Sequence, residues 1–547
     1  MVARRAGLYL QGSRMTRRSI CICGSVPFAG LFLVALAACE APAPAGEEES
    51  ASPAGVASAE PPSHLVPRWI GDEGAPEFED GAVRFRDISQ VMNGIGTAGS
   101  IHRASEMGHA NYRDELSGGP MAERGRAWLE LSGMLQQSFI IDERVAGRLR
   151  IPEETPDVWR AESATLEDLA IGASSYLIHH RAGRWSDHGL EAILTYAPTP
   201  LMVAPGLQVL RDHHRNGLFF PTPEAESTDL GSMAFGMSAL RGHIYAWVRE
   251  QKPGSDDDHG RVSEDRLEIS LGVGREELLG ISRAVALQLD EAWDEEVGMY
   301  RFPGANGTPG GGTARRYVRV DLTELGALLR GQKAIWEMLY VFGDDEDRER
   351  ARIMAERSTG ILMATMELTR PWGLPSRLRF GPNGIAPERD EVDVEALWVF
   401  VNDLTGGFSW NREREGTARL LSRFAPEALE AVGRFTDEVL VGALEHHLDA
   451  EGIPMAVVCY AEGSPRDARR SPAVVGAFLT AAANAYTTGE AFAPPERWEG
   501  SDPAREETGR ESADAGPEVL TRALYDALIR NVEFLEDVAL RPGDAVP

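Results

Sequence analysis

The stretch that decides the fold of this chain is Trp293-Asp294-Glu295-Glu296-Val297-Gly298-Met299-Tyr300-Arg301-Phe302. It follows a segment, 276–293, whose apolar residues recur at helical spacing. A glycine just after the last helical turn suits the left-handed C-terminal cap of a helix. The stretch therefore predicts a helix that ends near Gly298 and continues as a short extended segment.

Similar stretches recur at the ends of other predicted helices. Two copies lie at 213–220 and 446–455, and a looser one lies at 370–375. The spacing between their glycines accommodates one helix, a loop, a second helix and another loop, so it predicts an array of helical hairpins. These glycines, spaced 81, 75 and 79 residues apart, are Gly217, Gly298, Gly373 and Gly452.

Helical periodicity dominates the chain from residue 120 onward. Several of the periodic segments begin with an acid or a proline, such as Asp321 and Pro426, which suit the first turn of a helix. The pattern predicts about twelve helices. Their ranges are 121–139, 166–178, 190–196, 204–215, 229–248, 276–293, 321–342, 345–368, 392–404, 426–448, 472–486 and 519–540.

An array of hairpins joined by such turns resembles the six-hairpin glycosidase-like (α/α) toroids. The residues of 293–302 are the ones most similar to that group. The likeness covers roughly residues 120–490 at the level of architecture. The resemblance implies an all-α fold, an (α/α) toroid or incomplete toroid of about twelve helices with long rim loops. An open solenoid is the alternative, but tetratricopeptide arrays repeat every 34 residues or so and lack loops as long as 303–320 and 371–392.

The N-terminal residues have the pattern of an export signal. Arg14, Arg17 and Arg18 precede an uncharged stretch, and Leu36-Ala37-Ala38-Cys39 resembles a bacterial lipobox. That resemblance implies cleavage before Cys39, a lipid on its sulfur, and a protein anchored to a membrane of the bacterial cell envelope. A single transmembrane anchor is the alternative, although glycine and proline interrupt the stretch.

Composition divides the chain into four predicted parts. Residues 1–38 form the lipoprotein signal peptide, and 39–65 form a flexible stalk rich in alanine, proline and glutamate. The stalk has too few apolar side chains to offset the entropy of ordering. Residues 66–495 form the helical-hairpin toroid domain, and 496–547 form an acidic linker with a C-terminal helix.

The chain is strongly acidic, with 55 basic and 85 acidic residues and a net charge of −30. This charge repels nucleic acid, so we expect no nucleic-acid partner. After processing, Cys39 would carry the lipid and Cys459 would be the one remaining thiol, so no internal disulfide is expected. Cys459 lies in an apolar run and is predicted to be buried and inert.

The candidate catalytic residues are acids at predicted helix starts. In toroids of this kind the inner helices begin at one rim, where the preceding loops line a cavity. Asp229, Asp321 and Asp393 occupy such starts, and the last two follow the longest loops. Glycoside hydrolysis requires one protonated and one ionised carboxyl group. The alternative is that each acid caps its own helix.

Arginines and aromatic residues gather in the same loops. Forked guanidinium groups suit carboxylate or sulfate groups, so an acidic polysaccharide would fit as a substrate. The alternative is that the arginines pair with neighbouring acids. The candidate substrate-binding residues are Arg315, Arg316, Tyr317, Trp372 and Arg377.

Three histidine pairs, beginning at His179, His213 and His446, lie at predicted helix ends. None has the i, i+4 spacing of a zincin-type site, so a capping role for imidazolium is preferred and no metal or cofactor is predicted.

Two classes of function remain open, and the sequence does not decide whether the protein is an enzyme. The first is a membrane-anchored hydrolase or lyase that acts on a carbohydrate polymer. The second is a non-catalytic helical lipoprotein that binds or scaffolds a protein partner, because no specific catalytic motif is present.

Overall fold

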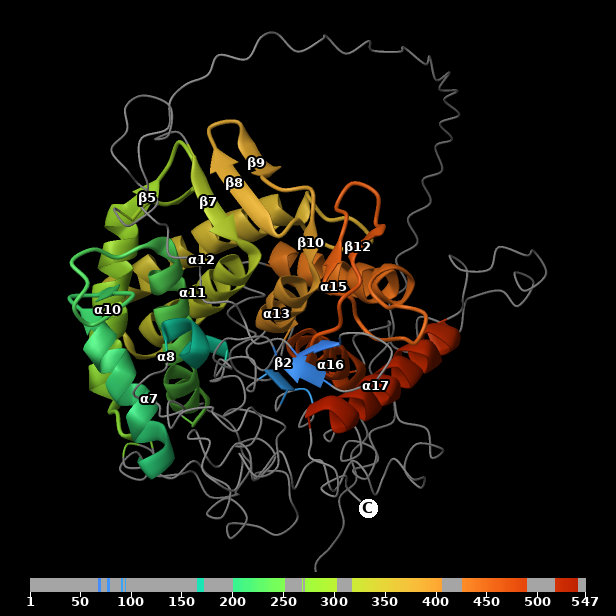
Figure 1. Ribbon diagram of the computed structural model, residues 1–547. Helices are drawn as coiled ribbons and strands as arrows, with labels where there is room; N and C mark the ends of the chain where they lie inside the picture. Colours follow the sequence, from blue (N-terminus) through green and yellow to red (C-terminus); the bar gives the residue numbers. More distant parts are fainter. Residues whose placement is uncertain are drawn as a thin grey trace, which may run out of the picture. The chain divides into compact units, whose positions relative to one another are not determined.

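The computed structural model describes residues 67–69, 76–78, 90, 91, 94, 165–171, 200–250, 268, 271–302, 317–405, 426–488 and 517–539. Long helices make up most of these residues, as predicted (Figure 1). The helix bounds agree with the predicted ones to within a few residues, because helical periodicity and end signals coincide. The predicted signal peptide, the stalk, Cys39, most of the linker, and the helices at 121–139 and 190–196 lie outside the described residues.

Four helices form an inner row in which each contacts the next. They are α8 (Leu230–Glu250), α11 (Leu322–Phe342), α13 (Val394–Thr405) and α16 (Pro472–Thr488). Helices α8 and α11 run in the same direction, because Gly231 lies beside Glu324 near their starts and Ser238 bonds Arg330 further along.

The other long helices alternate with the inner row along the chain and form an outer row. Helix α10 contacts α12, α12 contacts α15, and α15 contacts α17. Each inner helix therefore lies between two outer ones in sequence, as the hairpin array requires. The outer helices are α7 (Pro200–His213), α10 (Arg275–Ala292), α12 (Asp345–Met366), α15 (Pro426–His446) and α17 (Pro517–Ala539).

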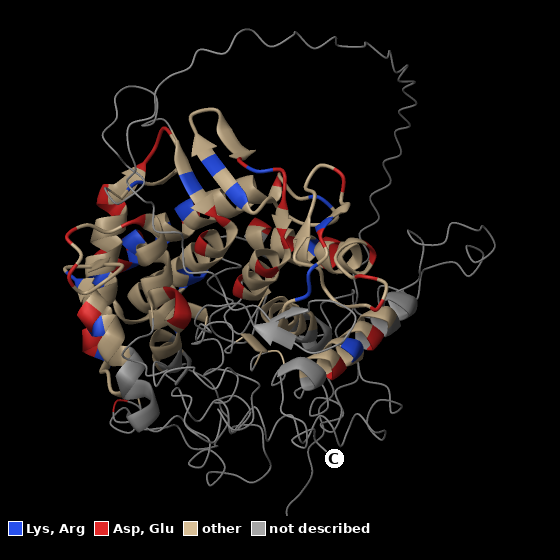
Figure 2. Ribbon diagram, in the orientation of Figure 1, with Lys and Arg blue, Asp and Glu red and all other residues tan. Residues whose placement is uncertain are grey.

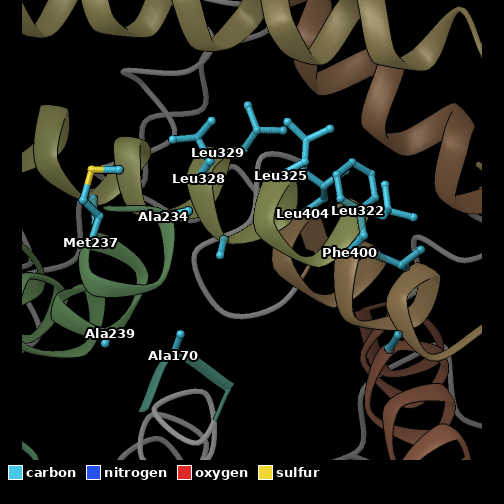
Figure 3. Close-up of a cluster of buried hydrophobic side chains, with 14 of the residues drawn as sticks. Ala170, Ala234, Met237, Ala239, Leu322, Leu325, Leu328, Leu329, Phe400 and Leu404 are labelled. Atoms are coloured by element: carbon cyan, nitrogen blue, oxygen red, sulfur yellow. The ribbon is translucent and has the colours of Figure 1, made fainter. Parts of the chain in front are cut away.

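Helix α11 forms the centre of the described core. Every residue from Leu325 to Leu339 is buried, so this helix is enclosed on all sides. Figure 3 shows leucines of α11 between Met237 of α8 and Phe400 of α13. Gly331 permits close packing, because a Cβ atom there would lie 2.6 Å from Cβ of Met237.

The turn stretches have the predicted backbone. The hairpin β3–β4 (His214–Arg215, Leu218–Phe219) follows α7, and β5–β6 (Trp293–Asp294, Met299–Tyr300) follows α10. The predicted turn glycines have positive φ angles, which confirms the left-handed conformation expected for them. The angles are 83° at Gly217, 66° at Gly298, 115° at Gly373 and 83° at Gly452.

The expectation of an all-α domain with long rim loops needs correction. The loops at 303–320 and 371–392 contribute a three-stranded antiparallel sheet in which β8 pairs with both β7 and β9. Apolar and basic residues alternate along β8, so one face packs on the helices. The strands outside the turn hairpins are β1 (Pro67–Trp69), β2 (Pro76–Phe78), β7 (Val318–Asp321), β8 (Arg377–Gly381), β9 (Gly384–Pro387), β10 (Val392–Asp393), β11 (Val457–Val458) and β12 (Pro465–Asp467).

Residues from before α7 pack against the inner row at two places. A Cβ atom on Gly476 of α16 would lie 2.4 Å from the carbonyl oxygen of Gln90, whose side chain donates to Glu395 of α13 (3.0 Å). The carbonyl oxygen of Ala170 accepts from Arg330 of α11 (2.7 Å). These contacts connect the beginning of the domain with its last inner helix, as a ring of hairpins requires.

Candidate active site

The inner helices begin at the same end of the domain as the strands. An outer helix ends, a turn or sheet follows, and an inner helix starts. Three predicted catalytic acids occupy these starts. Asp229 accepts from the backbone N–H of Ser232 (2.7 Å), Asp393 accepts from that of Ala396 (3.0 Å), and Asp321 precedes α11. The capping alternative therefore describes a real contact for Asp229 and Asp393, and Asp321 forms a capping box with Glu324 at the start of α11.

Glu324 in the first turn of α11 brings two of these acids together. Its Oε2 accepts from the backbone N–H of Asp321 (3.1 Å). Its Oε1 and the Oδ1 of Asp229 lie 2.6 and 3.6 Å from the position that a Cβ atom would take on Gly231. Because Gly231 has no side chain, both oxygens fit around one small space. We call Asp229, Asp321 and Glu324 the rim carboxylate cluster.

The cluster changes the acidity of Glu324. The pKa of its carboxyl group is raised to about 7, chiefly by burial and also by the charges of Asp321 and Asp229. The bond from the Asp321 backbone and the charge of Arg377 act in the opposite direction. The side chain is still partly accessible to solvent. Near neutral pH, the carboxyl group of Glu324 can therefore hold a proton beside the carboxyl groups of Asp229 and Asp321.

Arg377 of β8 pairs with Asp321 through both ends of its guanidinium group. Nε lies 2.5 Å from Oδ1, and Nη2 lies 2.9 Å from Oδ2. The hydrogen bond to Asp321 raises the pKa of Arg377. The arginine predicted to hold substrate thus contacts a carboxylate of the protein itself, which was the alternative interpretation.

Trp372 and Tyr317 lie in different surroundings. The indole N–H of Trp372 donates to the carbonyl oxygen of Tyr460 (2.8 Å), and the indole ring lies edge-on to His446. Trp372 therefore stabilises the turn of the chain in which it lies. Tyr317 is 40% exposed, and the guanidinium carbon of Arg379 lies 4.8 Å from its ring centre. The other two predicted substrate-binding residues, Arg315 and Arg316, lie outside the described residues.

Ser376 connects the starts of α11 and α13. Its carbonyl oxygen accepts from the backbone N–H of Leu322 (2.9 Å), and its own N–H donates to the carbonyl oxygen of Glu391 (2.8 Å). Asp321 and Asp393 therefore lie at neighbouring helix starts. The rim carboxylate cluster, however, forms between α8 and α11, around a glutamate that was not predicted.

The histidine pairs need one correction. His447 is fully buried, and burial lowers its pKa to about 4, so it is neutral and cannot complement the helix dipole as imidazolium. Its Nε2 lies 2.8 Å from the carbonyl oxygen of Trp372. Within the described part of the chain, no cluster of histidine, cysteine, aspartate or glutamate has an arrangement suited to a metal ion.

A second group of charges lies deeper along α11. Arg330 pairs with Asp403 of α13, and Nζ of Lys333 lies 2.6 Å from Oε1 of Glu337. Burial raises the pKa of Asp403 and of Glu337 and lowers that of Arg330. We call these four residues the interior charge network. A small cavity of about 20 Å³ adjoins Arg330 and Asp403.

Comparisons with known proteins give only distant likenesses. Neither the protein families nor the curated proteins searched contain a match to this sequence. A D-mannose isomerase structure is 11% identical with a TM-score of 0.40, covering 70% of this chain and 85% of the isomerase. A sugar epimerase from a ruminal bacterium is 12% identical with a TM-score of 0.37, covering 77% of this chain and 94% of the epimerase. Neither likeness supports a statement about the site.

Proposed function

We propose that this chain is an enzyme that acts on a carbohydrate, as a hydrolase or lyase, with Glu324 as the group that donates or accepts a proton. The observation that carries the proposal is the position of Glu324 beside Asp229 around the bare α-carbon of Gly231. A raised pKa beside specific charge partners, at an accessible rim, is typical of acid–base catalysts.

Roles follow from the geometry of the cluster. Protonated Glu324 would protonate a leaving oxygen, and the carboxylate of Asp229 would stabilise positive charge or activate water. Arg377 would hold the side chain of Asp321 in place. The carbohydrate class rests on the requirement of glycosidic chemistry for two carboxyl groups in different protonation states, together with the toroid resemblance.

The test is turnover of neutral and acidic glycans by the purified chain and its variants. We expect Glu324→Gln and Asp229→Asn to lower kcat by roughly 10²- to 10⁴-fold. Asp393→Asn is the matched control, because it changes another acid at an inner-helix start at the same end. If Asp393→Asn abolishes turnover and Glu324→Gln does not, the site lies at α13, as predicted from the loop lengths.

The alternative function is a scaffold without catalysis. Absence of turnover on every glycan, with a folded chain, would favour it. The partly accessible and like-charged rim carboxylate cluster is the specific observation against it, because carboxyl groups placed beside one another repel when ionised and do not serve stability well.

We also propose that the protein is anchored by a lipid on Cys39 in the bacterial envelope. The lipobox-like residues before Cys39 support this proposal. No helix in the described ranges has the length and apolar character needed to cross a membrane. Cys39→Ser should release the protein from the detergent phase or leave it unprocessed. A variant of wild-type size that stays in the detergent phase would contradict the proposal.

A further inference from the structure

The outward face of the sheet β7–β8–β9 carries positive charge in an acidic protein. Val320, Leu378 and Phe380 are buried on the inner face. The intervening residues, Arg319 and Arg379, are exposed on the other face. Figure 2 shows basic positions on β7 and β8. The chain as a whole has a net charge of −30, so this face differs from the average surface.

The two arginines lie directly opposite each other. Arg319 pairs with Arg379 in the register of β7 and β8. Like charges in opposed positions destabilise a sheet. Arg319 has a carboxylate partner, Glu388, at 2.5 Å. Arg379 has Tyr317 beside it, and no carboxylate among the described residues pairs with Arg379. The unfavourable pair would be relieved by an anion bound at Arg379.

This face continues from the rim carboxylate cluster. Along β7, Arg319 and Asp321 are two residues apart, and along β8, Arg377 and Arg379 are two residues apart, so all four share one face. Two residues of strand span about 7 Å. The order from the helix outward is therefore Glu324, then the Asp321–Arg377 pair, then the Arg319–Arg379 pair, then Tyr317.

We infer that Arg379 and Tyr317 form a binding subsite for an acidic saccharide whose chain extends from the rim carboxylate cluster across this sheet. The inference rests on the proposed function and names its substrate class. The guanidinium fork of Arg379 would hold a carboxylate or sulfate group through two hydrogen bonds. The exposed ring of Tyr317 would cover the apolar face of the sugar ring.

A nucleic acid fits this face less well. Each phosphate of a strand carries a charge, so binding needs many basic side chains, and the strong negative charge of the chain opposes it. Because Arg319 pairs with Glu388, Arg379 and one aromatic ring remain for a ligand, which suits a saccharide with well-separated acidic groups. Single-stranded DNA is therefore the competing ligand in the test.

The test measures binding by calorimetry, so it does not depend on turnover. The full chain is titrated with oligogalacturonate, with heparin oligosaccharides, with neutral dextran and with single-stranded DNA. We expect one of the acidic saccharides to bind, and Arg379→Ala to weaken that binding about tenfold or more, as loss of a bidentate charged contact should. Tyr317→Ala should weaken binding and Tyr317→Phe should retain it.

The matched control is Arg352→Ala, which removes one exposed arginine from α12 and should leave binding unchanged. Equal binding by wild type and Arg379→Ala, binding of neither acidic saccharide, or tighter binding of DNA would each overturn the inference. Turnover of a neutral glycan without binding of acidic ones would overturn the inference and leave the proposed function intact. Binding without any turnover would uphold the subsite and contradict the proposed function.

Discussion

Two charged groups on the same helix, α11, lie in opposite environments. The rim carboxylate cluster at its start is partly accessible: Asp321 pairs with Arg377, and Glu324 lies between Asp321 and Asp229. The interior charge network further along is nearly inaccessible, and its charges form pairs of opposite sign. Because the interior charge network is enclosed and its charges are paired, it indicates a structural role. Because the rim carboxylate cluster is accessible and has an excess of like charge, it indicates a place where a proton can be held and released.

The interior charge network should give the largest effect on stability. Asp403→Ala leaves Arg330 buried without its counter-charge and should lower the free energy of unfolding by about 3–5 kcal/mol. Urea denaturation measures this. The double variant Arg330→Met/Asp403→Leu removes both charges and should recover most of the loss, because buried pairs can often be replaced by apolar residues. Wild-type stability of Asp403→Ala would mean that the network is not structural.

The rim carboxylate cluster should respond in activity rather than in stability. Gly231→Ala places a methyl group where Oε1 of Glu324 lies 2.6 Å away, so Glu324 must move. We expect a roughly tenfold to hundredfold fall in kcat/KM with the fold retained. Gly242→Ala, in the same helix with open space around its α-carbon, should have wild-type activity. Equal activity of both variants would place the chemistry elsewhere.

The pH dependence of unfolding should reveal the titration of Glu324. Its pKa in the folded protein is about 7, above the ordinary 4.5, so the fold favours the protonated form. This contribution to stability is fully present below pH 4.5 and is lost as the pH rises through 7. Glu324→Gln should therefore gain stability relative to wild type between these values and hold that difference above them. Parallel curves for the two proteins would contradict the raised pKa.

The smallest effect is expected at an exposed ion pair. Arg352 lies between Glu349 and Glu356 on the surface of α12, where solvent screens the charges. Arg352→Ala should leave the urea midpoint unchanged within error. A clear shift would show that pairing alone, without enclosure, stabilises this protein, which would weaken the contrast between the two regions of α11.

Local sequence patterns predicted the helices but not the sheet. The bounds of α11 and α12 follow from a period of 3.6 and from acids at their starts, which are local signals. The sequence predicts a loop where strands β8 and β9 lie, because strands of five and four residues beside glycine and proline give a weak period. The alternation Arg377-Leu378-Arg379-Phe380 was the available signal for the sheet.

The site was predicted only in part, for a related reason. Asp229 and Asp321 are predictable from the sequence as helix starts, but Glu324 is not distinguished there, because an acid three residues after an N-cap usually completes a capping box, as Glu324 does. Its raised pKa comes chiefly from burial, and the charge of Asp229, which belongs to a different hairpin, adds to it. No local pattern reports such a contact. Likewise, the burial that keeps His447 neutral comes from segments distant in sequence.

The contact of Gln90 with α13 and α16 has a consequence for how the chain folds. Gln90 bonds Glu395, 305 residues away, and its backbone lies against Gly476. A ribosome must therefore synthesise nearly all of the domain before its first described helical residues can find their partners. Contacts so distant along the chain slow folding and leave apolar surface exposed meanwhile. Closure at this contact thus comes late in synthesis or after it, and until then chaperones have an opportunity to act.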